Sequence, residues 1–419
     1  MSINLTKYSS WCTLAYSFFM ASLFMPIRFN SLSILILCFI TIVGFASHKI
    51  TFKKLGYLWI LPLMFLTLVM GLAYTENMDY GKSIIERNLG FLVFPFITLP
   101  ITKISATHQR LLFNIFLLSS AALGIYCLGI ATQFFLETGS AYLNDSTHFV
   151  YNVFMHQLLT EPAGMHAIYF SLYLAFGGSV IVYLLANQKV ENRSTKTLYI
   201  GYLLFSTFLL FLLKSSNFAL VYPLTLFGIL GLRYRTQLLK KASHIIAAIV
   251  LLISVITFSF NIISTKLESL EIETDYSSTD MRPLSLRMAI WSNSIDVIKK
   301  DWIKGSGTGD SEDELTKAYQ ESNFTIGLES NFNSHNMFLQ YWMSNGVVMV
   351  LLYILILALS FWYSLKYKQY LLTIFLILFT SFSLTESTLQ TQRGIIFFLF
   401  LMCAFYWEKQ LFLPSKDNQ

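Results

Sequence analysis

The chain has 419 residues, of which 55% are hydrophobic and only 12% are charged. This composition indicates a polytopic membrane protein rather than a soluble one. The few ionisable side chains are then expected where the chain leaves the lipid or where it performs chemistry. The formal net charge of +6 comes mainly from the basic loops between apolar stretches, so it does not indicate a nucleic-acid partner.

Twelve apolar stretches are about long enough to cross a bilayer, and they predict an all-α fold. Lipid offers no partner to backbone amides, and no stretch alternates with period two over ten residues, so helices are expected rather than barrel strands. Prolines 95 and 100 are expected to kink or end the fourth span. The predicted spans are 10–27, 30–47, 55–73, 88–101, 111–135, 163–187, 197–213, 217–232, 242–263, 336–362, 369–384 and 394–412.

One polar segment interrupts the apolar pattern between the ninth and tenth spans. We therefore expect transmembrane helices 1–9 in residues 1–263 and an outer loop subdomain containing helices in residues 264–335. Residues 336–419 are expected to form helices 10–12 and a cytoplasmic tail.

The distribution of basic residues predicts the orientation. With the N-terminus in the cytoplasm, 17 of the 29 Lys and Arg residues fall in the inside segments, and few fall in the short outside connections. We therefore expect a multi-pass membrane protein with both termini cytoplasmic and the large loop outside.

Within the large loop, Leu284 to Trp302 is predicted to be an amphipathic helix at the mouth of the bundle. Its apolar stripe consists of Trp291, Ile295, Ile298 and Trp302, and Arg287 lies one turn before Trp291. The alternating glycines that follow, Gly305 to Asp310, allow two interpretations: an anion-binding turn or a plain turn that ends a helix. Asp310 and the acids after it are interpreted as the solvated start of a further helix.

His335 lies where the polar loop becomes a long apolar helix. Ser334 or Asn333 is expected to cap that helix. Free amides at a helix N-terminus attract phosphate, and a neutral imidazole there can act as a general base. The alternative is an interfacial histidine bonded to the cap.

Further polar side chains are predicted at the same outer level. Because charges at a membrane surface are costly to desolvate, the cations suggest a shared anionic ligand, most naturally a diphosphate. The alternative for each residue is an interfacial anchor or a helix cap. The cations are Arg87, Lys214, Arg287 and Arg393, and the neighbouring groups are His166, Tyr169 and Glu386.

The order of these features resembles the O-antigen ligase and O-antigen polymerase family. The resemblance rests on Arg287-x-x-x-Trp291, on the glycines through Asp310, and on Ser334-His335-Asn336-x-x-Leu339-Gln340 with Asn345-Gly346 behind it. His166-x-x-Tyr169 and the segment from Glu386 to Gly394 also resemble positions in bacterial members. One departure is Asn217, because many relatives carry an arginine after a serine in that turn.

The resemblance implies an inverting, metal-independent glycan transfer without a cofactor at the outer face of the bacterial inner membrane. The large loop would then lie in the periplasm. The donor would be a glycan on undecaprenyl diphosphate, and the acceptor would be the lipid A core in a ligase or a second lipid-linked repeat in a polymerase. His335 would activate the acceptor hydroxyl, and arginines such as Arg287 would hold the diphosphate. Asn336, Trp291, His166, Tyr169 and Glu386 would contact the substrates.

Two other classes compete with a transferase. A transporter of lipid-linked glycans should carry polar residues at mid-membrane in broken helices, whereas this chain has its charges at the ends of the predicted spans. A structural scaffold would not need the cations to converge near His335.

Overall fold

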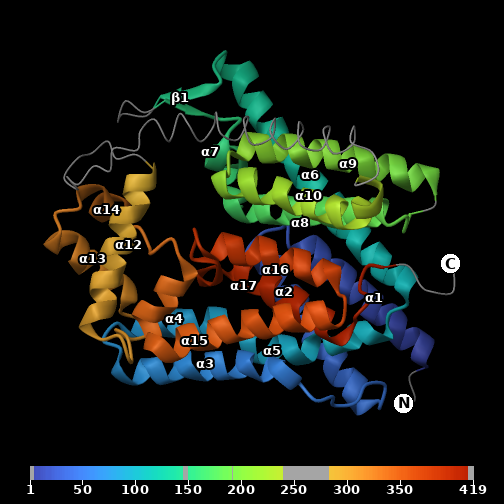
Figure 1. Cartoon of the computed structure of the whole chain (residues 1–419), viewed down its shortest axis with the longest axis horizontal. Helices are drawn as coiled ribbons and strands as arrows, with labels where there is room; N and C mark the ends of the chain where they lie inside the picture. The colour runs from blue at the N-terminus through green and yellow to red at the C-terminus, as the bar shows by residue number, and fades with distance from the viewer. Residues whose placement is uncertain (1–3, 145–149, 191, 239–282, 414–419) are drawn as a thin grey trace.

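A computed structural model describes residues 4–144, 150–190, 192–238 and 283–413 (Figure 1). Within these ranges the fold is helical, as predicted, apart from one short antiparallel hairpin that the sequence pattern did not indicate. The hairpin pairs β1 (Tyr142–Asn144) with β2 (Val150–Asn152) in the polar connection after a long helix.

The helices in chain order are α1 (Leu5–Ser22), α2 (Ile27–Ala46), α3 (Ile60–Gly71), α4 (Met78–Asn88), α5 (Gly90–Ile97), α6 (Ala106–Thr138), α7 (His156–Thr160), α8 (Ala167–Ala186), α9 (Arg193–Leu213), α10 (Ser216–Leu238), α12 (Pro283–Lys300), α13 (Ser311–Glu321), α14 (Thr325–Ser330), α15 (Met337–Lys366), α16 (Tyr370–Ser383) and α17 (Gln392–Trp407). Short 3₁₀ turns are η1 (Gly56–Trp59), η2 (Leu72–Tyr74), η3 (Leu99–Lys103), η4 (Glu161–Ala163) and η5 (Thr388–Gln390).

Seven helical stretches in the described ranges are long and apolar enough to cross a membrane, and three shorter apolar helices accompany them. Helices lie at every predicted span inside these ranges. The ninth predicted span, 242–263, and the first part of the predicted loop subdomain lie outside the described residues. The multi-pass character is therefore confirmed, while the total of twelve spans stays a prediction.

The α-helix of the fourth predicted span ends between its two prolines. Pro95 lies inside α5, which ends at Ile97, and Pro100 lies in the 3₁₀ turn η3. Proline lacks the amide hydrogen that an α-helix needs at each interior position. Together α4, α5 and η3 form one segment from Met78 to Lys103 that is long enough to span a bilayer.

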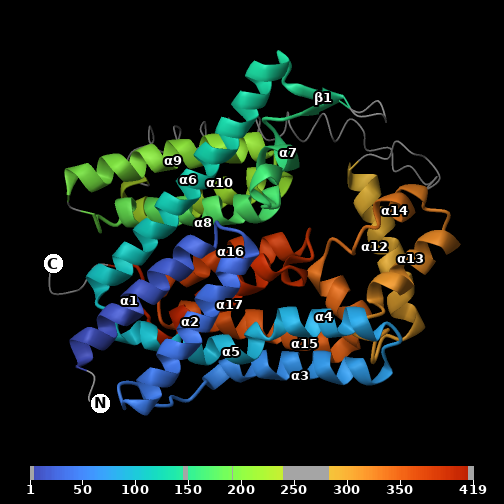
Figure 2. The same cartoon turned by 180° about the vertical axis from the view of Figure 1, so that it is seen from behind.

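Loops that the charge pattern assigns to one side of the membrane contact one another. The Ser9 hydroxyl donates to the Lys103 carbonyl at 2.8 Å, and the Arg110 guanidinium donates to the Lys189 carbonyl at 2.8 Å. Helix α1 begins at this end of the molecule, and α12 to α14 lie at the opposite end (Figures 1 and 2). The fold is therefore consistent with the predicted alternation of the loops between the two sides of the membrane. Which end of the molecule faces the cytoplasm stays a prediction.

Helix α17 lies at the centre of the bundle, with every residue from Arg393 to Phe405 buried. Its Phe397 packs against Tyr173 of α8 and Phe116 of α6, with ring centroids 4.3 and 6.1 Å away. Aromatic rings bury large areas and prefer such tilted or offset contacts. This packing fixes the start of α17 at the same end as the functional side chains described below.

Helices α12 to α14 and their connections form an outer unit, residues 283–335, with its own small core. Ala289, Ile290 and Val297 of α12 are buried against α13 and α15. The predicted apolar stripe coincides only in part with this buried face. Ile298 is buried, but Ile295 is 43% exposed. Trp302 is 53% exposed and lies beyond the end of the helix. The buried face also contains Ala289, which is small, and Ser294, which is polar, so a search for large apolar residues overlooks both.

Candidate functional site

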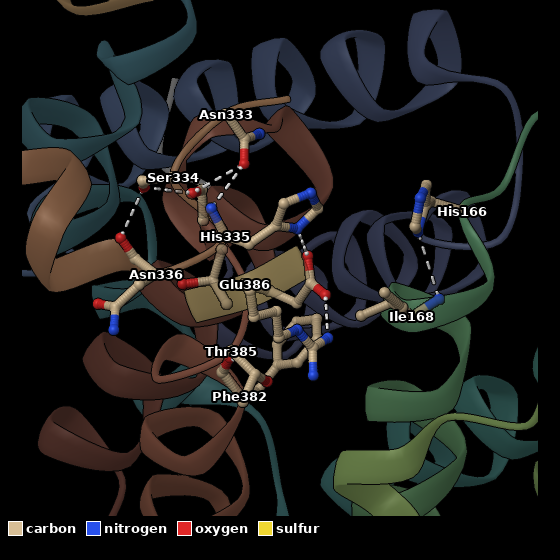
Figure 3. Close-up of polar contacts among 12 residues, drawn as sticks. His166, Ile168, Asn333, Ser334, His335, Asn336, Phe382, Thr385 and Glu386 are labelled. Atoms are coloured by element: carbon tan, nitrogen blue, oxygen red, sulfur yellow. Dashed lines mark hydrogen bonds and ion pairs between the residues drawn. The ribbon is translucent and has the colours of Figure 1, made fainter. Parts of the chain in front are cut away.

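The backbone of His335 is held in the left-handed region, with φ of 43°. The Asn333 carboxamide oxygen accepts the His335 amide at 3.0 Å and the Ser387 hydroxyl at 3.2 Å (Figure 3). The buried Ser334 hydroxyl lies 3.1 Å from the Ser387 hydroxyl. Left-handed backbone is uncommon for residues other than glycine and clusters at functional sites. These hydrogen bonds among Asn333, Ser334, His335 and Ser387, called the His335 hydrogen-bond cluster below, determine where the imidazole points.

Asn336, rather than Ser334 or Asn333, caps helix α15. Its side-chain oxygen accepts the Phe338 and Leu339 amides at 2.9 and 3.2 Å, and its amide group donates to the Leu384 carbonyl at 3.2 Å. The predicted caps are wrong because the side chains of Asn333 and Ser334 form hydrogen bonds within the His335 hydrogen-bond cluster. The predicted substrate contact of Asn336 stays a prediction.

His335 belongs to a chain of three charged or polar side chains from distant parts of the sequence. Its Nδ1 lies 2.9 Å from Oε2 of Glu386, and Oε1 of Glu386 lies 3.4 Å from Nη2 of Arg287 (Figure 3). An ionised carboxylate only accepts hydrogen bonds, so it selects the histidine tautomer with the proton on Nδ1. Nε2 is then left as a proton acceptor on a ring that is 28% exposed.

Arg287 keeps most of its donors available to a ligand. Its side chain is 34% exposed, and Glu386 is its ion-pair partner within the described residues. A guanidinium carries five N–H groups in a planar fork that matches phosphate oxygens. Trp291, one turn further along α12, packs against the core of the outer unit, and its indole N–H is buried without a hydrogen-bond partner in the described residues.

His166 and Tyr169 lie at the start of α8, as predicted, but differ in environment. His166 is exposed at the helix cap, where its Nδ1 accepts the Ile168 amide at 3.4 Å (Figure 3). Desolvation by the surrounding protein lowers the pKa of His166, and the negative charge of Glu386 opposes that effect. Tyr169 is buried and donates to the Thr388 carbonyl at 3.3 Å, so it supports the turn beside Glu386.

The remaining predicted cations have different partners. Arg87 is half-buried and donates to the Gln390 carbonyl at 2.9 Å. Lys214 is exposed at the left-handed C-terminus of α9. Arg393 is buried and donates to the Leu23 and Gly164 carbonyls, both at 3.1 Å. Arg393 therefore joins α17 to two other segments, and Arg287 becomes the leading candidate for an anionic ligand.

We expect Arg393→Lys to lower stability without weakening donor binding. A single ammonium cannot span both carbonyls, and a buried carbonyl left unpaired costs roughly 1–3 kcal/mol. The measurement is the thermal midpoint of the purified protein, compared with Arg28→Lys at an exposed position. A raised KM for the donor at an unchanged midpoint would instead make Arg393 a ligand contact.

The glycine turn after α12 is a clasp onto the bundle and not an anion site. The Ser306 and Gly307 amides donate to the Met343 and Ser344 carbonyls at 2.8 and 2.9 Å. The Asp310 carboxylate is buried and accepts the amides of residues 76 and 77 at 2.8 and 2.7 Å. The interpretation of Asp310 as a solvated acid is therefore wrong.

The clasp explains the Asn345-Gly346 pair. Helix α15 is kinked there, with Gly346 at φ 66° and ψ −164°. The kink frees the carbonyls that the clasp amides bind, and the Val347 amide donates back to the Trp302 carbonyl at 3.1 Å. A helix interruption leaves backbone groups that need new partners. The outer unit supplies them and is thereby joined to the helix that begins beside His335.

Ser387 and the positioning role of Asn333 were not predicted from the sequence. A usable signal was the run of hydroxyl side chains around Glu386, at positions 385, 387 and 388, between two apolar helices. Within the described residues no group of three His, Cys, Asp or Glu side chains could hold a metal ion.

Residues 201–354 match the family model described as O-antigen ligase. A search of curated proteins finds no match to the chain. The matched range contains Lys214, Arg287, Trp291, His335 and Asn336, whereas Glu386 lies outside it. The match therefore includes His335 and Arg287 but not Glu386, which the fold brings into contact with both.

Proposed function

We propose that this chain, whose residues 201–354 match the O-antigen ligase family model, transfers a glycan from undecaprenyl diphosphate to the lipid A core at the periplasmic face of the inner membrane. The family match indicates O-antigen ligase or polymerase-type glycan transfer. The observation that supports the transfer step, which a ligase and a polymerase share, is the chain of contacts from His335 through Glu386 to Arg287.

In the proposed reaction His335 is the general base. Glu386 holds the Nδ1 proton, so Nε2 takes the proton of the acceptor hydroxyl as its oxygen attacks the anomeric carbon. The carboxylate also stabilises the imidazolium that forms, as a negative charge 2.9 Å from a ring nitrogen must. The acceptor C–O bond forms while the bond from the anomeric carbon to phosphate breaks, which inverts the configuration.

The leaving diphosphate needs charge neutralisation more than a proton. Arg287 can offer a bidentate fork while one of its nitrogens stays near Glu386. Lys214 and Arg87 are further candidates for the same anion, because Lys214 is exposed and Arg87 is half-buried. No metal or cofactor takes part in this scheme, and membrane lipids surround the bundle.

A polymerase remains the alternative, because it would share the donor, the base and the arginine and differ only in the acceptor. A transporter is disfavoured because the His335 hydrogen-bond cluster and the contact with Glu386 orient one imidazole. Carrying a lipid across a membrane requires no such orientation. The ligase is proposed first because the matching family model is described as O-antigen ligase.

The experiment is the gel pattern of lipopolysaccharide from a strain that lacks the gene, together with its pool of lipid-linked glycans. A ligase predicts long polymer accumulating on the carrier with bare lipid A core. Core carrying one repeat and no ladder would indicate the polymerase. Normal lipopolysaccharide and a normal carrier pool would contradict both, and complementation with the unmodified gene is the control.

A further inference from the structure

A polar cleft of about 710 Å³ lies in the outer unit, and none of His335, Glu386 and Arg287 lines it. Its walls are the end of α12, helix α13 and the turn between η2 and α4. Gly305 and Ser306 of the clasp form part of the lining. Because the clasp is hydrogen-bonded to α15, the cleft is attached to the helix that begins beside His335.

The lining indicates the chemical class of the ligand. It carries five carboxylates and three ammonium groups, with amides and hydroxyls between them. The excess of negative charge disfavours a diphosphate or another polyanion. No cluster suited to a metal ion occurs in the described residues. An uncharged or amino sugar fits better, because each hydroxyl both donates and accepts hydrogen bonds.

The charged groups of the cleft are held in place before any ligand arrives. Lys317 lies 2.7 Å from Glu314, and the Asn77 side chain donates to Asp313 at 2.9 Å, which joins α4 to α13 across the cleft. The Tyr74 hydroxyl donates to the Lys304 carbonyl at 2.6 Å. Such fixed donors and acceptors reduce the ordering cost of binding a flexible chain.

We propose that this cleft is a remote subsite that binds sugars of the glycan at a distance from the transferred bond. The inference rests on the proposed function, because the cleft would meet further sugars only if a lipid-linked glycan reacts beside His335 and extends over the outer unit. Binding energy from non-reacting sugars then favours long donors over short ones.

The test compares two donors on the same polyprenyl diphosphate, one with a single repeat and one with long polymer. Gln320→Trp fills the cleft from an exposed position of α13. We expect the KM for the long donor to rise about fivefold or more, with its kcat and the single-repeat KM unchanged within about twofold, as for loss of uniform binding. Lys299→Trp, exposed on α12 outside the cleft, is the matched control.

An equal effect on both donors, or none on the long one, would overturn the subsite. Calorimetry with lipid-free polysaccharide of long chain gives a second measurement that needs no transfer: the unmodified protein should bind it and Gln320→Trp should not. If neither donor is transferred but this binding and its loss are found, the proposed function fails and the cleft stands. Absence of polysaccharide binding to the unmodified protein counts against the cleft itself.

Discussion

Replacing His335 by asparagine should lower kcat for glycan transfer by about 10²- to 10⁴-fold, the usual contribution of a general base. Asparagine tolerates the left-handed backbone that His335 adopts at φ 43°, so this variant removes the imidazole without straining the loop. Alanine would confound the two effects. The measurement is the initial rate with purified donor and acceptor, together with the thermal midpoint, which should stay close to that of the unmodified protein.

His48→Asn is the matched control for this prediction. His48 also has a left-handed backbone, at φ 53°, and lies exposed at the opposite end of the bundle, so its replacement should leave transfer unchanged. Glu386→Gln extends the test, since an amide group can donate to Nδ1 and move the ring proton to Nε2, where it blocks the base. Normal rates in folded His335→Asn protein would remove His335 from the mechanism.

Replacing Gly346 by alanine should detach the outer unit from the bundle. A Cβ at this position would collide with the backbone of Ile303, and the φ and ψ of Gly346 belong to a region that essentially only glycine occupies. We expect a loss of at least about 1–3 kcal/mol from backbone strain, with additional loss from the clash. The checks are a lower thermal midpoint and faster proteolytic cleavage in residues 283–335.

Gly129→Ala provides the matched control, because this glycine lies within helix α6 with open space around its Cα. Alanine is favoured over glycine in a helix by about 1 kcal/mol, so stability should be unchanged or higher. Transfer by Gly346→Ala should fall as well, since the clasp binds the helix that begins beside His335. Unchanged stability and cleavage would mean that the clasp does not hold the outer unit.

The catalytic proposal combines residues that the sequence brought forward for different reasons. Arg287 and His335 were predicted from a helix face and a helix start, while Glu386 was predicted only as a neighbouring substrate contact. The contact that joins them spans 51 residues between His335 and Glu386 and 99 between Arg287 and Glu386. Such pairings depend on how helices pack, and spacing along one segment does not contain that information.

Composition and periodicity by themselves determined the helical membrane class, the positions of the described spans and the place of His335 before a long helix. These features are local, since a bilayer requires long apolar helices and a polar residue before one marks its start. Only the tertiary structure decided which polar groups have partners: it buried Arg393 and Asp310 against backbone groups and left Arg287 half-exposed. Whether a charged side chain has a partner depends on neighbours distant in sequence, and a single amino-acid sequence does not show which residues these are.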